Sequence, residues 1–259
     1  MSEQTSRRHK TLRGPRAGLI FFRKDGEARK DLEKRVNDAV FPACQGGPHN
    51  NTIAGIATTL LQATQPSWKA YAQQVIKNAQ ALADELLKNG YKLQTGGTDN
   101  HLVLWDLRPL KLTGSKVEKI GDLVGITINS TFHASFLHLV CFLTIFAENA
   151  VSGDASAQVP GGIRIGTAAL TSRDMREDDL RTVADFLHRA VQLSLLLQKE
   201  SGSKLLKDFV RTATVPEEGK VGAQQVTQLR REVRAFARQW PLPGIIHPIT
   251  RPAGVEEDY

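Results

Sequence analysis

The sequence has little cysteine, and this shortage excludes several classes of protein. Its two cysteines, Cys44 and Cys141, are too few and too far apart along the chain to suggest a disulfide framework or a cysteine-based metal site. We therefore expect a protein of a reducing compartment, with no structural disulfide and no metal. The first eighteen residues also lack the apolar core of a secretory signal, which argues against export.

Long apolar runs are absent as well. The most apolar stretch, residues 136–147, is much shorter than the ~20 residues that a membrane-spanning helix needs. The composition of 41% hydrophobic and 24% charged residues allows a sizeable core in one large or two small domains. We expect no membrane partner.

Positive charge is abundant by contrast. The net charge of +7 favours anionic partners of several kinds, nucleic acid among them. Five of the twelve residues 7–18 are arginine or lysine, and such a stretch is most often a solvated basic arm. Lys10, however, lies in a Gly- and Pro-containing loop just before the strand-like residues 19–22, a place where a lysine can be held in a pocket.

Five blocks of the chain occur in an order that is characteristic of one enzyme family. They are HKTLRGPR at 9–16, VFP with QGGPHN at 40–50, TGGTDNH at 95–101, LTGSKVEK at 112–119 and PGGIRIGT at 160–167. Together they resemble the serine hydroxymethyltransferases, and the first block resembles the loop that carries the cofactor lysine. The resemblance covers nearly all of the chain except the first eight residues, a stretch near 130–148 and the last dozen.

The resemblance implies an α/β fold of the fold type I, aspartate-aminotransferase-like class. Residues 1–90 would be the C-terminal part of the cofactor-binding large domain with its connecting helices. A small α+β domain would follow over 91–250, and a tail over 251–259. The family's first half would carry most strands of the large sheet, the aspartate at the pyridine nitrogen, the ring stacked on the cofactor and the acid–base glutamate. We therefore expect a truncated family member.

The same resemblance implies an activity, the interconversion of serine plus tetrahydrofolate and glycine plus 5,10-methylenetetrahydrofolate. Pyridoxal 5'-phosphate would be held as a Schiff base on Lys10, beside His9. Arg164 presents a planar guanidinium that matches a carboxylate with two parallel hydrogen bonds. By resemblance it would bind the carboxylate of the amino acid, so that Lys10, His9 and Arg164 form the catalytic set.

A homo-oligomer, a dimer or tetramer with the cofactor site at the dimer interface, is also implied. Gly46 and Gly47 allow a ligand to approach the backbone closely, and a helix starting near residue 49 would favour anions at its N-terminus. The resemblance places this loop at the partner's cofactor phosphate. It places Phe41 in the partner's folate site, and Asn149 against the folate ring.

Residues 130–148 interrupt the family pattern. Where the family has one lysine after its Ile-Thr-Ile-Asn-like strand, this chain has nineteen residues. Our hypothesis is a translated intron. Suppose that Ser130 is encoded by AGT and Glu148 by GAG. Removing the bases from the GT of the Ser130 codon through an AG that ends at the first base of the Glu148 codon joins A to AG. The result is AAG, a lysine codon.

Three interpretations follow from the sequence. The first is an active serine hydroxymethyltransferase, and the second is a truncated, catalytically inactive member that pairs with a full-length subunit or does nothing. The third and weaker interpretation is a basic nucleic-acid-binding module. We expect a cytoplasmic protein, and a mitochondrial location stays open because the expected N-terminal half is missing.

The periodicity of apolar residues predicts the main elements. Helices are expected over 31–40, ended by Phe41-Pro42, over 53–89 with a break at Gln65–Pro66, and over 115–125, 178–200 and 226–240. The helix that ends at 89 should be capped by Gly90, and its core stripe should be Tyr71, Val75, Ala79, Leu82 and Leu86. Strands are expected over 19–22, 91–95, 101–107 and 126–129, and around Arg164.

Overall fold

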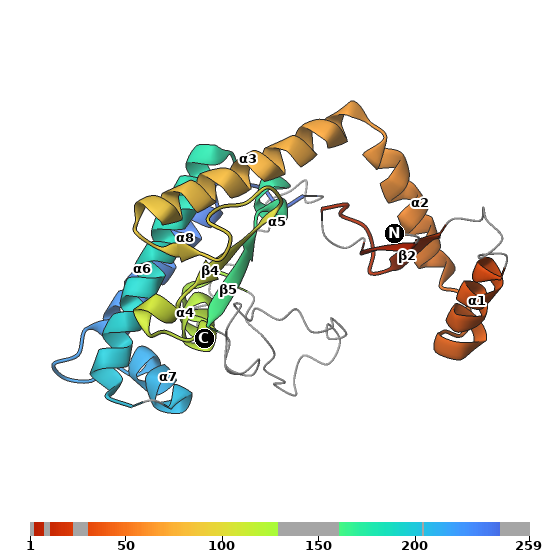
Figure 1. Cartoon of the computed structure of the whole chain (residues 1–259). Coiled ribbons are helices and arrows are strands. Elements are labelled where there is room, and N and C mark those ends of the chain that lie inside the picture. The colour runs from red at the N-terminus through yellow and green to blue at the C-terminus, as the bar shows by residue number, and fades with distance from the viewer. Residues whose placement is uncertain (1–2, 8–10, 23–30, 129–160, 204, 244–259) are drawn as a thin grey trace, which may run out of the picture. The chain divides into compact units, whose positions relative to one another are not determined.

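The computed structural model describes residues 3–7, 11–22, 31–128, 161–203 and 205–243. His9, Lys10, Asn149, the insert 130–148 and the tail 251–259 therefore lie outside the described residues. The chain divides into two compact units, residues 1–73 and 74–259, and each is described by itself below (Figure 1). The domain boundary expected at residue 90 stays a prediction.

The first unit begins with an antiparallel pair of strands, β1 (Glu3–Arg7) and β2 (Gly18–Phe22). Helix α1 (Leu32–Asp38), the π-helical turn η2 (Ala39–Cys44), helix α2 (Asn50–Ala63) and the first turns of α3 (Pro66–Lys88) follow. The sequence predicted β2 and the helices α1, α2 and α3, but not β1. The helix expected over 31–40 ends at Phe41 as predicted, because the backbone of Phe41 is extended (φ −135°, ψ 126°). A short further turn follows it to Cys44.

The first unit buries few side chains. No residue of α1 or η2 is buried, and Thr59 is the one buried residue of α2. Several large apolar side chains of these elements are exposed instead, namely Val40, Phe41, Ile53, Leu60 and Leu61. The described helices of this unit therefore close no core of their own.

The second unit is built on a three-stranded antiparallel sheet in the order β3 (Lys92–Leu93), β4 (Leu102–Asp106), β5 (Gly162–Gly166). Trp105 lies opposite Leu93 on one side and opposite Ile163 on the other. Val103 and Trp105 alternate with half-buried residues, as expected for strands that pack one face on a core.

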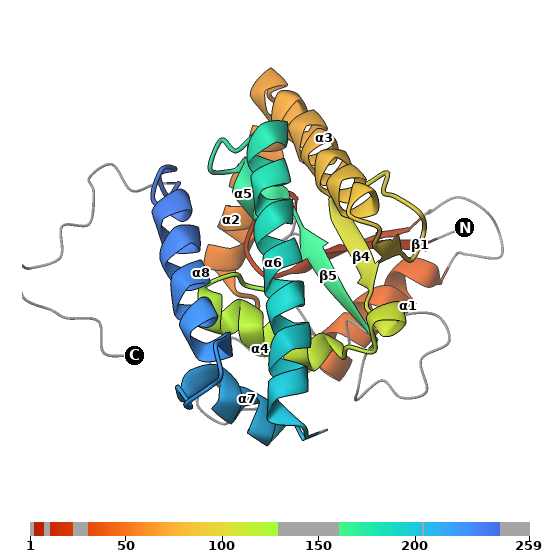
Figure 2. The same cartoon turned by 90° about the vertical axis from the view of Figure 1, so that its left-hand side faces the viewer.

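Helices cover the buried face of this sheet. After η3 (Arg108–Leu110) come α4 (Gly114–Val124), α5 (Ala168–Thr171), α6 (Glu177–Ser201), α7 (Leu206–Thr214) and α8 (Gly222–Ala237). Figures 1 and 2 show α6 running along the sheet with α8 beside it. One cluster of the core joins the sheet to α3, α4 and α6, and a second joins α4, α6, α7 and α8. The mixed α/β class predicted from the sequence is confirmed.

The ends of α3 show how local sequence sets the elements. Its predicted start after Gln65 is found at Pro66. At the other end Gly90 has a φ of 79°, its N–H donates to the Leu87 carbonyl at 2.9 Å, and the Tyr91 N–H donates to the Leu86 carbonyl at 3.1 Å. This is the glycine cap that the sequence predicted, because a left-handed residue costs glycine little.

The strand expected over 126–129 was wrong for the residues that the structure describes. Residues 126–128 form no strand, although Ile128 is buried and Ile126 packs against the core. The Ile126 carbonyl lies so close to Gly121 that a Cβ there would be 2.7 Å away. The apolar alternation of this segment therefore reports packing under α4 and not backbone pairing.

A buried polar network fastens α3 to the segment after β5. The Asn78 amide nitrogen donates to Thr171 Oγ1 at 2.8 Å and to the Met175 carbonyl at 2.9 Å. Thr167 Oγ1 donates to the Val75 carbonyl at 2.9 Å. Since these groups are buried and satisfied, the end of β5 is held in one position.

Some features are absent from the described ranges. No helix there is long and apolar enough to cross a membrane. Nor do three or more His, Cys, Asp or Glu side chains gather there as metal ligands would. Cys44 is an exposed free thiol, whereas Cys141 lies outside the described residues.

Candidate functional site

Arg164 lies at the centre of β5, opposite Leu104 of β4. Directly opposite residues of an antiparallel pair share a face, so Arg164 is on the face opposite to that of Trp105 and Ile163. Its side chain is half-buried. The guanidinium therefore leaves the sheet on the side that does not pack into the core.

Both ends of β5 are pinned to β4 by backbone hydrogen bonds. The Leu107 N–H donates to the Gly161 carbonyl at 2.8 Å, and the Thr167 N–H donates to the His101 carbonyl at 3.0 Å. A side chain on a strand fixed in this way has a precisely positioned base, as binding sites require.

Asp106, an acidic residue on the same face of β4, is already ion-paired. It is 2% exposed, and its carboxylate accepts hydrogen bonds from Nε and Nη2 of Arg108, both at 2.9 Å, with Lys92 Nζ at 3.4 Å. The Arg108 guanidinium holds the pKa of this carboxyl below its usual range, although burial acts in the other direction. Asp106 therefore stays ionised and paired.

Arg164 itself has no acidic partner among the described residues. Among the described residues, no carboxylate lies within ion-pairing distance of its guanidinium, while Asp106 is committed to two other cations. A half-buried, unpaired guanidinium is an unusual feature for a folded chain, because buried charges are normally paired. Arg164 is therefore suited to bind a carboxylate from outside the chain.

Gly46 and Gly47 lie between η2 and α2, in the first unit. Neither has a positive φ, and a Cβ at either position would meet no atom within 4 Å. The chain's own conformation and packing thus give no reason for glycine at these positions. Close approach of a group from outside the chain would give one.

The helix that follows this loop has an open N-terminus. His49 is the N-cap residue of α2, and its side chain makes no capping hydrogen bond. The first turn contains no acidic residue either. The N–H groups of such a turn attract anions such as phosphate. Phe41, the third predicted residue of this segment, is 61% exposed and available for contact.

Lys10, His9 and Asn149 lie outside the described residues, so their predicted roles stay predictions. One contact, made three residues after Lys10 along the chain, was missed by sequence reasoning. The Arg13 guanidinium lies over the ring of Tyr71, 3.9 Å from its centroid. Tyr71 had been assigned to the core stripe of α3, and no local signal links residues 58 positions apart.

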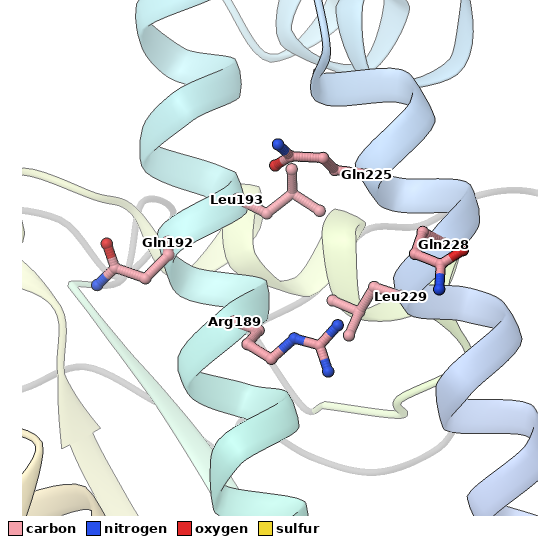
Figure 3. A pocket seen from close by; sticks show the side chains of 6 residues that line it. All are labelled: Arg189, Gln192, Leu193, Gln225, Gln228 and Leu229. Atoms are coloured by element: carbon pink, nitrogen blue, oxygen red, sulfur yellow. The ribbon is translucent and has the colours of Figure 1, made fainter.

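A cavity of about 340 Å³ between α6 and α8 contains none of the predicted site residues (Figure 3). Of its six lining residues, Arg189 is the charged one, and it is ion-paired with Glu232 at 2.5 Å. The hydrogen bond from Arg189 lowers the pKa of Glu232 and raises that of Arg189. This cavity is therefore a gap beside a structural ion pair.

Comparisons with known proteins agree with the five sequence blocks. The family described as serine hydroxymethyltransferase matches residues 3–187. The Arabidopsis thaliana protein named serine hydroxymethyltransferase 4 is 46% identical over 251 residues, which cover 93% of this chain and 48% of that protein. The Bombyx mori serine hydroxymethyltransferase is 43% identical over 248 residues, covering 93% and 49%.

The chain belongs to the serine hydroxymethyltransferase family. The resemblance found in the sequence is thereby confirmed, and with it the α/β fold class of the family. The chain spans about half the length of the curated relatives it matches. A Caenorhabditis briggsae serine hydroxymethyltransferase shows the same proportion, with 93% of this chain matching 44% of that protein at 44% identity.

Proposed function

We propose that this chain carries one half of a pyridoxal-phosphate site that interconverts serine and glycine with tetrahydrofolate. The proposal rests on Arg164, which is half-buried on the face of the sheet opposite to the core and has no carboxylate partner in the part of the chain that the structure describes. A carboxylate from an amino acid would complete this site with two parallel hydrogen bonds, the pairing that a guanidinium favours.

The segment between η2 and α2 supports a phosphate-binding role. Gly46 and Gly47 have open space where a side chain would stand, and the N-terminus of α2 has no capping side chain. Such a loop can bring backbone N–H groups to a phosphate. In the proposed homo-oligomer these glycines meet the partner's cofactor phosphate, and Phe41 lines the folate site of that same active site.

The residues present thus fit pyridoxal phosphate in part. When bound, this group withdraws electrons from the Cα atom of the amino acid. The chain's own contributions would be covalent attachment by Lys10 Nζ beside His9, orientation of the carboxylate by Arg164, and contact of Asn149 with the folate ring. Each fixes a reactant in place, which lowers the entropic part of the barrier.

The test is serine binding by the full chain in the presence of pyridoxal phosphate. Arg164→Lys keeps the charge but loses one of two parallel charge-assisted hydrogen bonds, and we expect about 10- to 100-fold weaker binding. Arg181→Lys is the matched control, since Arg181 is ion-paired on the surface with Asp178 of its own helix. Equal affinity of the Arg164→Lys variant and the unaltered chain would refute the assignment.

A second candidate is an inactive family member, and the poorly buried first unit favours it. Apolar side chains such as Ile53 and Leu61 are more than half exposed, so the part that would hold the phosphate loop is uncovered. Folate-dependent formation of glycine from serine by this chain without a full-length subunit decides between the two. We expect no turnover, and robust turnover would overturn the inactive interpretation.

A nucleic-acid-binding module receives less support. Arg13, from the basic stretch 7–18, is exposed, but its guanidinium lies over the ring of Tyr71 of its own chain. We propose a cytoplasmic location. One relative, 45% identical over 93% of this chain, is named chloroplastic, so that family members also occur in an organelle.

A further inference from the structure

A glycine lies next to Arg164 on the face of the sheet opposite to the core. Side chains alternate along a strand, so residues 162, 164 and 166 of β5 share this face. Gly166 is exposed, whereas Ile163 and Ile165 pack on the core from the other face. Residues i and i+2 of a strand are about 7 Å apart. A side chain at position 166 would therefore stand beside that of Arg164.

Within the described ranges, neither backbone conformation nor packing requires glycine at this position. Gly166 has no positive φ, so residues with a side chain could adopt its backbone conformation. An added Cβ would meet one atom within 4 Å, the His101 carbonyl oxygen at 3.7 Å, which is an ordinary van der Waals distance. Glycine is also unfavourable in strands, where it often marks a place at which a ligand approaches the backbone closely. A ligand would account for Gly166.

Two leucines of β4 border the space over Gly166. Leu102 is paired with Gly166, and Leu104 is paired with Arg164. Directly opposite residues share a face, with Cβ positions about 4.5–5.5 Å apart. Both leucines are half-buried. The space therefore has an apolar border on the side of β4 and a guanidinium beside it along β5, and such a border strengthens the attraction between Arg164 and a carboxylate.

Building on the proposed function, we infer that Gly166 is a specificity-determining residue of the carboxylate site. Its missing side chain leaves the space in which an amino acid lies while the carboxylate of that amino acid meets Arg164. Gly166 offers no side-chain group to the ligand and contributes this space alone. A side chain at position 166 would fill the space and compete with the amino acid.

The experiment measures two quantities for each variant of the full chain, serine binding in the presence of pyridoxal phosphate and the midpoint of urea unfolding. Gly166→Ala should bind serine about 10-fold more weakly, the effect of one misplaced methyl group in a fitted pocket. Gly166→Val adds two further methyl groups and should bind more weakly still. The urea midpoints of both should be unchanged or higher, because both residues restrict the unfolded chain and valine favours strands. A structural glycine would instead lose stability on substitution.

Gly97→Ala is the matched control. Gly97, in the loop between β3 and β4, also lacks a positive φ, and an added Cβ there meets no atom within 4 Å. This variant should bind serine like the unaltered chain, and a loss equal to that of Gly166→Ala would overturn the inference.

Two other results would also overturn it, namely equal serine affinity of Gly166→Ala and the unaltered chain, or a lower urea midpoint of Gly166→Ala. In each of these cases the proposed function stands if Arg164→Lys binds serine more weakly. Absence of serine binding by the unaltered chain overturns both.

Discussion

Lys116→Met is expected to stabilise the second unit at neutral pH. Lys116 on α4 is 6% exposed and has no carboxylate partner among the described residues. Its Nζ donates to Gln198 Oε1 at 2.8 Å and lies 5.3 Å from the centroid of the Phe209 ring. Burial lowers the pKa of this amine from its ordinary value of 10.5.

The magnitude follows from the opposing contributions. Desolvation of a buried ammonium costs several kcal/mol. The hydrogen bond to Gln198 offsets about 2 kcal/mol of this cost, and the contact with Phe209 about 0.5–1 kcal/mol. Methionine keeps most of the stem and removes the charge. We therefore expect a gain of about 1–2 kcal/mol at pH 7, seen as a higher urea midpoint.

The pH dependence gives the sharper test. The pKa of Lys116 is lower in the folded state than the value of 10.5 in the unfolded state. At a pH between these two pKa values the unfolded state binds a proton that the folded state does not, so the free energy of unfolding rises with pH. At a pH below both values Lys116 is charged in both states, and the desolvation penalty is fully present. The advantage of Lys116→Met should therefore shrink as the pH approaches 10.5. Lys119→Met, on a partly exposed position of the same helix, should show no such trend, and a constant advantage of Lys116→Met would refute the argument.

Three further outcomes are expected. Arg173→Ala should lower the free energy of unfolding by about 2 kcal/mol, seen as a lower urea midpoint, because Arg173 donates to the carbonyls of Ala237, Trp240 and Pro241 at the end of α8; an unchanged midpoint would contradict this. Leu61→Glu should raise the saturation concentration of the chain, since this leucine is 67% exposed. Sequencing of genomic DNA and transcript across residues 130–148 should show the GT and AG of an intron, and other codons there would exclude it.

Long helices could be predicted from the sequence because apolar residues at helical spacing form one face that packs on the core. In α3 the predicted stripe is buried at Val75, Ala79, Leu82 and Leu86. Short strands were harder to predict. A strand was expected over 91–95, but β3 contains only Lys92–Leu93. Its length depends on hydrogen bonds to a partner strand, which local sequence does not identify.

In the candidate site, too, local features could be predicted from the sequence, whereas tertiary contacts could not. The motif around Arg164 identified the residue and its strand. Its lack of an acidic partner within the described ranges could not be predicted, because it depends on Arg108 and Lys92 pairing with Asp106. The contact between Arg13 and Tyr71 joins two segments that are separated by several elements, and neither residue type in its local pattern signals the other.

The two units differ in how many side chains they bury, and this difference bears on function. The second unit closes two clusters of buried side chains by itself, whereas helix α2 of the first buries Thr59 alone. Exposed apolar surface such as that of Ile53 and Leu61 promotes association. Both the active and the inactive interpretation assign the carboxylate of the amino acid to Arg164. They differ in whether another subunit covers the exposed apolar side chains of the first unit. If a full-length subunit supplied that cover, the carboxylate site would need no change to serve catalysis.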